Sequence, residues 1–99
     1  MINHVVLFKL KQYPAEEKSK VIAKLKSSLL ALKDKISEVK YMEAGENYEL
    51  NSKSFDLVLI SHFESTEDLD IYRVHPEHLK VLALVGEVTE ARAAVDFRF

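Results

Sequence analysis

Residues 55–63 read FDLVLISHF, a stretch whose apolar side chains fall on both sides of an extended chain. One side carries Phe55, Leu57, Leu59 and Phe63, and the other carries Val58 and Ile60. Enrichment in branched and aromatic residues predicts a β-strand here. Residues 2–10, INHVVLFKL, have the same character and predict another strand.

The sequence between these two strands predicts a helix, a further strand and a turn. Pro14 followed by Glu16 and Glu17 is typical of a helix start. Apolar residues at helical spacing then predict a helix over about 14–34, with one buried stripe. We expect a strand over 37–46 and a polar turn over 49–54, where the sequence is ELNSKS.

The rest of the chain predicts a broken helix and a closing strand. Ser65 and Thr66 offer N-caps for a helix that breaks near His75, because a residue before proline avoids the helical region. Pro76 can restart the helix, which then runs on through Leu79, Leu82 and Ala83. Residues 92–99, RAAVDFRF, predict a strand. One side of it carries Ala93, Val95, Phe97 and Phe99.

This β-α-β-β-α-β order predicts a single α+β domain over residues 1–99, with a ferredoxin-like four-stranded antiparallel sheet. Two helices cover only one face of such a sheet. The strands over 2–10 and 55–63 are its central pair, yet both are apolar on both faces, with Val5 and Leu7 on the second side of the first. We therefore expect an identical sheet to cover the open face, giving a homodimeric α+β barrel. A monomer that tolerates scattered exposed apolar residues is the alternative.

Composition excludes several classes of protein. A net charge of −2 argues against nucleic acid or an anionic membrane as partner. No cysteine is present, so disulfides, thiolate catalysis and cysteine-bound zinc are excluded. The start of the chain lacks a signal peptide and is too short to span a bilayer, so we expect a cytoplasmic protein. With Gly45 and Gly86 as its only glycines, the chain has no phosphate loop, and we expect no nucleotide cofactor.

The candidate catalytic and binding residues are Tyr72, His75 and His78, together with His4 and His62 in the central strands. Histidine transfers protons near neutral pH, and a tyrosine hydroxyl can polarise a carbonyl. Strand histidines that project into the barrel lumen beside Tyr72 and His78 would form an acid/base site in an apolar pocket.

Structural roles are the alternative for each histidine. His75 suits a helix cap, and the strand histidines could simply bond backbone carbonyls. His75 and His78 have a spacing compatible with a metal pair, but no further ligand motif supports one, so we predict no metal site.

Three stretches together resemble the stress-responsive A/B barrel (Dabb) family: NHVVLFKLK at the start, Tyr72 with the HPEH of residues 75–78, and AAVDFRF at the end. The resemblance implies a dimeric α+β barrel of ferredoxin-like subunits. It also implies a mechanism, since a plant member of the family cyclises a linear polyketide without a cofactor. The catalytic tyrosine and histidine of that member match Tyr72 and His78, and a strand histidine matches His4.

Two functions follow from the residues and the resemblance together. In the first, a small apolar carbonyl compound binds in the barrel beside His4 and His75. His78 then abstracts a proton while Tyr72 orients the carbonyl, in a cofactor-free cyclase-like or lyase-like reaction. In the second, the chain is a non-catalytic stress-response or assembly protein whose Tyr/His cluster is structural. A cofactor-free monooxygenase is a third reading, which rests on fold analogy alone.

Overall fold

Four antiparallel strands form one sheet in the order β2-β3-β1-β4, which confirms the ferredoxin-like α+β fold. The computed structural model describes residues 1–49 and 53–99. The strands are β1 (Ile2–Leu10), β2 (Tyr41–Glu46), β3 (Leu57–Phe63) and β4 (Thr89–Arg98). The helices are α1 (Ala15–Leu30), α2 (Leu32–Lys35), α3 (Thr66–Val74) and α4 (Pro76–Val88).

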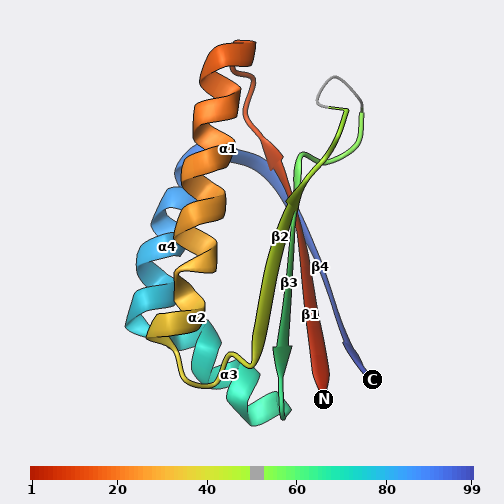
Figure 1. Cartoon of the computed structure of the whole chain (residues 1–99), viewed down its shortest axis with the longest axis vertical. Helices are drawn as coiled ribbons and strands as arrows, with labels where there is room; N and C mark the ends of the chain where they lie inside the picture. The colour runs from red at the N-terminus through yellow and green to blue at the C-terminus, as the bar shows by residue number, and fades with distance from the viewer. Residues whose placement is uncertain (50–52) are drawn as a thin grey trace.

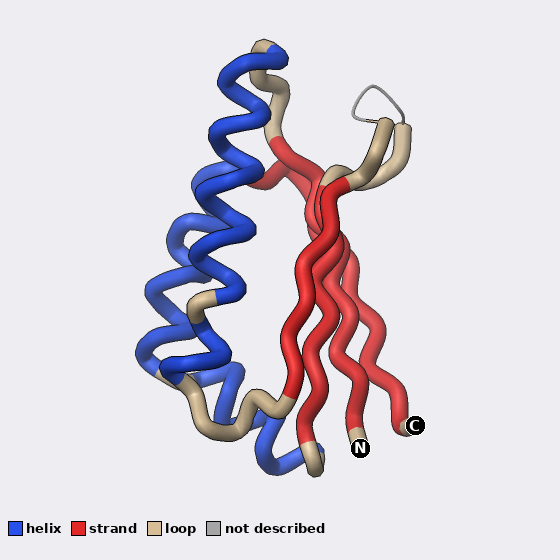
Figure 2. The backbone as a smooth tube through the Cα atoms, viewed as in Figure 1, coloured by secondary structure: helices blue, strands red, loops and turns tan. Residues whose placement is uncertain are grey.

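The helices all lie on one face of the sheet, and the other face is left open (Figures 1 and 2). The helix-facing side of β1 and β3 forms the core with the buried stripe of α1 and with α3 and α4. Its most enclosed members include Phe8, Leu25, Leu59, Phe63 and Tyr72. No helix within the described residues is long and apolar enough to cross a membrane.

Several predicted boundaries were wrong, each for a local reason. The helix expected over 14–34 divides at Ala31 into α1 and the short α2. The strand expected from residue 37 begins at Tyr41, because the preceding segment turns to bury Val39. The strand expected from residue 92 begins at Thr89, because α4 passes directly into β4. The turn expected over 49–54 lies partly outside the described residues.

The strand expected from Phe55 begins two residues later, at Leu57, because the side chain of Asp56 binds groups of β1 and α1. Its carboxylate accepts a hydrogen bond of 2.8 Å from the backbone amide of Leu10 and pairs with Lys18 Nζ at 3.0 Å. Asp56 is buried at the point where the pairing of β1 with β4 shifts register. The residue therefore anchors the end of β1 and does not extend β3.

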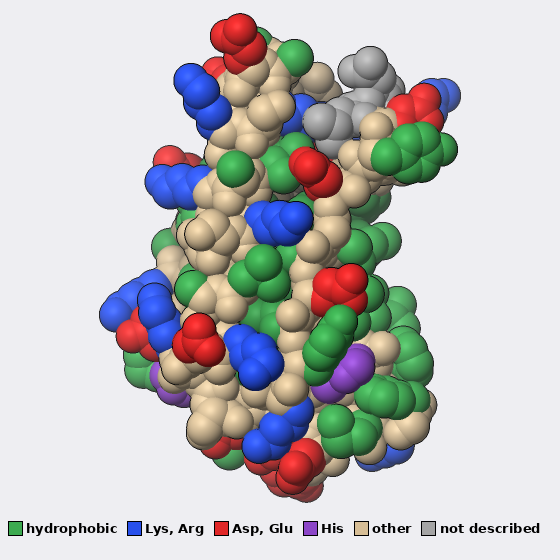
Figure 3. All heavy atoms as spheres, in the orientation of Figure 1, with side chains coloured by type: hydrophobic (Ala, Val, Ile, Leu, Met, Phe, Trp, Pro, Cys, Tyr) green, Lys and Arg blue, Asp and Glu red, His purple; other side chains and the backbone are tan. Residues whose placement is uncertain are grey.

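The open face is the side of the sheet turned away from the helices, and it is largely apolar. By strand alternation and register it carries Val5, Leu7, Val58, Ile60, Ala93, Val95 and Phe97. Val95 is 63% exposed and Phe97 is 46% exposed. Hydrophobic side chains gather along this side of the molecule in the space-filling view (Figure 3). The apolar residues predicted on the second side of β1 and β3 therefore lie on this open face.

The two strand histidines lie on opposite faces of the sheet, which corrects the expectation that both enter one pocket. His4 faces the helices, where it is buried. His62 pairs with Asn3 and faces away from them. Its ring centroid lies 4.7 Å from that of Tyr41 and 4.7 Å from that of Phe99. Only His4 can therefore join a site with the helix residues Tyr72 and His78.

Candidate active site

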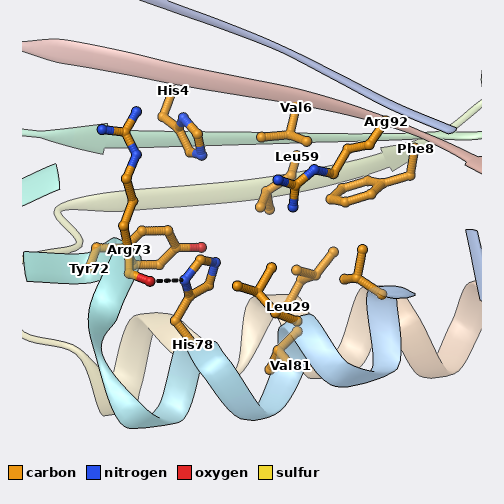
Figure 4. A pocket seen from close by; sticks show the side chains of 12 residues that line it. His4, Val6, Phe8, Leu29, Leu59, Tyr72, Arg73, His78, Val81 and Arg92 are labelled. Carbon is orange, nitrogen blue, oxygen red and sulfur yellow. Dashed lines mark hydrogen bonds between the residues drawn. The ribbon is translucent and has the colours of Figure 1, made fainter. Parts of the chain in front are cut away.

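A cavity of about 160 Å³ lies between the sheet and the helices of a single chain (Figure 4). The expected site was the barrel lumen, and this location is different, because the lumen would lie on the open face. The cavity walls are mostly aliphatic, with polar groups from His4, Tyr72, Arg73, His78 and Arg92. Its lining residues are His4, Val6, Phe8, Leu29, Leu59, Tyr72, Arg73, His78, Val81, Leu82, Val85 and Arg92.

The break between α3 and α4 brings Tyr72 and His78 together. Pro76 has no amide hydrogen to continue α3, and His75 takes an extended conformation with φ −62° and ψ 135°. The chain then turns into α4 with Pro76 in its first turn, as predicted. As a result the rings of Tyr72 and His78 lie 4.2 Å apart between centroids.

His78 is oriented by the end of α3. Its Nδ1 lies 3.1 Å from the carbonyl oxygen of Arg73. A carbonyl can only accept a hydrogen bond, so Nδ1 carries the proton and the lone pair of neutral His78 is on Nε2. Burial is the largest of several effects that lower the pKa of His78 below its ordinary value of 6.5. His78 is therefore a neutral base at physiological pH.

Tyr72 supplies the matching donor. Its side chain is buried, and its hydroxyl has no hydrogen-bond partner among the described residues. In Figure 4 this hydroxyl points toward His78 and the cavity. Burial raises the pKa of Tyr72 to about 12, so the phenol keeps its proton at physiological pH. The group can therefore donate to a ligand oxygen placed in the cavity.

His4 closes the opposite side of the site and is held by Asp96. Its Nδ1 is hydrogen-bonded to the Asp96 carboxylate, whose second oxygen accepts from Arg73 Nη2 at 2.8 Å. Arg73 also pairs with Asp70 at 3.0 Å. Because the carboxylate is the acceptor, Nδ1 of His4 is the donor, and Nε2 is left as its other polar atom. The His4 ring lies 6.1 Å from that of Tyr72.

The structure places His75 elsewhere. This residue does not line the cavity, and its Nδ1 accepts a hydrogen bond of 3.1 Å from the amide of Glu77. It therefore caps α4, the alternative that its position before Pro76 suggested. Within the described residues no group of three or more histidine or carboxylate side chains is arranged to hold a metal ion.

Three further residues belong to the site and were not predicted. Asp96, Arg73 and Arg92 contact His4 or line the cavity. The alternation of the closing strand does set Arg92 and Asp96 on the side opposite Val95. No sequence signal, however, pairs that side with His4, because this contact depends on the register between β1 and β4.

The Tyr72 hydroxyl, which has no hydrogen-bond partner among the described residues, should lower the free energy of unfolding. A buried donor without a partner costs about 1–3 kcal/mol, so Tyr72→Phe should raise the free energy of unfolding or leave it unchanged. Urea denaturation at fixed protein concentration measures this effect. A loss of more than about 1 kcal/mol would show that the hydroxyl is structural.

Tyr48→Phe is the matched control for this prediction. Tyr48 is 96% exposed. Its hydroxyl is open to solvent, so the control should change stability little. The comparison separates the removal of an unsatisfied hydroxyl from the general effect of a tyrosine-to-phenylalanine change.

Nearly the whole chain matches a known protein family. The model of the stress responsive A/B barrel domain matches residues 2–99. The chain belongs to the stress responsive A/B barrel domain family. This Dabb chain is 28% identical to the stress-response A/B barrel domain-containing protein DABB1 of Arabidopsis thaliana, over 98% of its own length. It spans 46% of that relative, about half of the longer protein.

Solved structures show the same fold. A dimeric ferredoxin-like protein of unknown function from Bacteroides fragilis is 36% identical to the Dabb chain. The match covers 99% of this chain and 95% of the other, with a TM-score of 0.89. The hydroxynitrile lyase of Passiflora edulis is 18% identical, with coverage of 97% and 90% and a TM-score of 0.76. At that identity the lyase is evidence for the fold alone.

Proposed function

We propose that this Dabb domain binds a small carbonyl compound in the cavity and abstracts a proton next to the carbonyl without a cofactor. One observation supports this most directly. The Tyr72 hydroxyl and Nε2 of neutral His78, neither of which has a hydrogen-bond partner in the described part of the chain, belong to the lining of the same cavity, and the two rings lie 4.2 Å apart. A donor and a base at this separation are what enolisation of a carbonyl compound requires.

The proposed step is a simple proton transfer. The C–H bond next to the carbonyl breaks, the proton moves to Nε2 of His78, and the electron pair becomes that of an enolate. The Tyr72 hydroxyl donates a hydrogen bond to the oxygen on which negative charge develops. The enolate can then take back a proton or attack an electrophile, which is the chemistry of a cyclase or lyase.

The size of the cavity limits the ligand. Its volume of about 160 Å³ is close to that of an apolar cavity of roughly 150 Å³ that accommodates benzene. Cyclohexanone is therefore a suitable probe, since it matches the ring size and has acidic protons beside its carbonyl. In deuterated water the protein should accelerate exchange of those protons, followed by NMR, above the buffer rate. No acceleration by any small ketone would refute the proposal.

The lowered pKa of His78 sets the expected pH dependence. The base must be neutral, so the exchange rate should rise with pH through a pKa below 6.5. It should then stay level well above neutrality, because the pKa of about 12 keeps Tyr72 protonated. The exchange rate measured from acid to alkaline pH checks this profile. A rate that rises through a pKa above 6.5 would show that another group is the base.

The free energy of unfolding should also depend on pH through the titration of His78. Below about pH 6.5 the unfolded chain protonates His78 while the folded chain resists protonation. The unfolded state then binds more protons, so the contribution of this residue to stability is complete above the unfolded pKa and falls as the pH drops.

We further propose that two copies pair through the open face to form the α+β barrel. Support comes from the exposed apolar residues of that face and from the Bacteroides fragilis relative, which is described as dimeric. The non-catalytic alternative has one observation in its favour, the hydrogen bond by which His78 joins α4 to the end of α3. Substitutions of His78 separate the two functions.

A further inference from the structure

We propose that the ligand of the cavity carries a carboxylate in addition to its carbonyl group, and that Arg92 binds this carboxylate. The inference rests on the proposed function, because it assigns the substrate class of the same cavity. The ligand would be a short oxo acid, with its carbonyl at Tyr72 and its acid group at Arg92.

The guanidinium of Arg92 differs from that of Arg73 in having no partner among the described residues. The guanidinium of Arg73 is held by Asp70 at 3.0 Å and by Asp96 at 2.8 Å. The Arg92 guanidinium makes no hydrogen bond or ion pair within residues 1–49 and 53–99. The cavity thus has one cation that is already neutralised and one that is available.

The direction of the Arg92 side chain places this charge at the cavity. Arg92 leaves the exposed edge strand β4 and extends past Phe8 and Leu59, and its guanidinium is directed toward the side where Tyr72 and His78 lie (Figure 4). Its positive charge also lowers the pKa of both Tyr72 and His78, although burial has the larger effect on each. The charge therefore acts on the groups to which the carbonyl would bind.

The chemistry of the walls favours an anion of this kind. Between Arg92 and the polar end, the cavity is lined by Val6, Leu29 and Leu59, which suit a short hydrocarbon spacer. The planar guanidinium can form two parallel hydrogen bonds to a carboxylate. A neutral ketone would use only the polar end of the cavity, while an oxo acid uses both ends.

Levulinate and levulinamide test the inference, because they differ only in the charged end. Both have a ketone with exchangeable protons, and both can be followed by deuterium exchange. The wild-type protein should show a KM for levulinate about tenfold or more below that for levulinamide. In Arg92→Gln the ratio of the two KM values should fall close to one. Taking the ratio within one variant cancels any change in the pKa of His78.

Arg98→Gln is the matched control. It removes the same charge from the same strand, at a residue that does not line this cavity. The wild-type KM ratio should persist in this variant. Equal KM values for both probes in the wild type would overturn the inference, as would an Arg98→Gln effect equal to that of Arg92→Gln.

Failure of the inference and failure of the proposed function give different results. If cyclohexanone exchange is catalysed but levulinate has no advantage, the acid/base site stands and the assignment of Arg92 is wrong. If none of the three ketones is exchanged, the proposed function fails and the inference fails with it.

Discussion

His78→Asn is expected to lower the rate of protein-catalysed proton exchange by roughly 100-fold or more, the range typical of losing a general base. An asparagine amide at this position can still donate to the carbonyl of Arg73, as Nδ1 of His78 does at 3.1 Å. It has no counterpart of Nε2, however. The variant therefore removes the base and keeps the hydrogen bond between α3 and α4.

The measurements are deuterium exchange of cyclohexanone and urea denaturation of the same samples. The catalytic role predicts a large loss of exchange with a change in unfolding free energy below about 1 kcal/mol. A purely structural role predicts no protein-catalysed exchange in the wild type or in His78→Asn, and a loss of stability in His78→Ala, which removes the hydrogen bond to the Arg73 carbonyl. Full exchange activity in a stable His78→Asn variant would rule out His78 as the base.

His75→Asn is the matched control. The substitution is the same and lies three residues away, outside the cavity. Asparagine is among the best N-cap residues, so it can replace the bond that His75 accepts from Glu77. Both exchange and stability should be close to wild type. A loss of exchange here would restore His75 to the ligand site.

Val95→Asp is expected to convert the proposed dimer into a monomer. Val95 lies on the open face opposite Val5, with 63% of its surface exposed in the single chain. In a sheet-on-sheet interface the new carboxylate would lose its water without gaining a partner, which is among the most destabilising changes an interface can undergo. Light scattering at micromolar concentration should report twice the chain mass for the wild type and the chain mass for the variant.

Val74→Asp controls for the general effect of a surface carboxylate. It makes the same change at a residue that is 70% exposed on α3, on the helix side of the molecule. This variant should remain dimeric and fold normally. A wild-type protein of monomer mass would refute the dimer, and a dimeric Val95→Asp would move the interface away from the open face.

Much of this architecture follows from local patterns in the sequence. The apolar runs at 2–10 and 55–63 predict the central strands, and the structure confirms β1 and β3 there. The apolar second side of these strands shows that one layer of helices leaves a face uncovered. Pro76 predicts the break that sets Tyr72 and His78 face to face, because the loss of one backbone amide acts on its immediate neighbours.

Other features were decided only by the tertiary structure. The pairing of β1 with β4 joins His4 to Asp96 across 92 positions, and a register different by one residue would turn Asp96 to the other face. The same register aims Arg92 at the cavity, while the pairing of β1 with β3 sets His62 opposite Asn3 and so on the other face from His4. Strand register depends on contacts between distant segments, so it cannot be predicted from the local sequence. The sequence by itself determined the sheet, its open face and the Tyr72–His78 pair. The tertiary structure decided that the cavity lies under the helices and which charged side chains complete it.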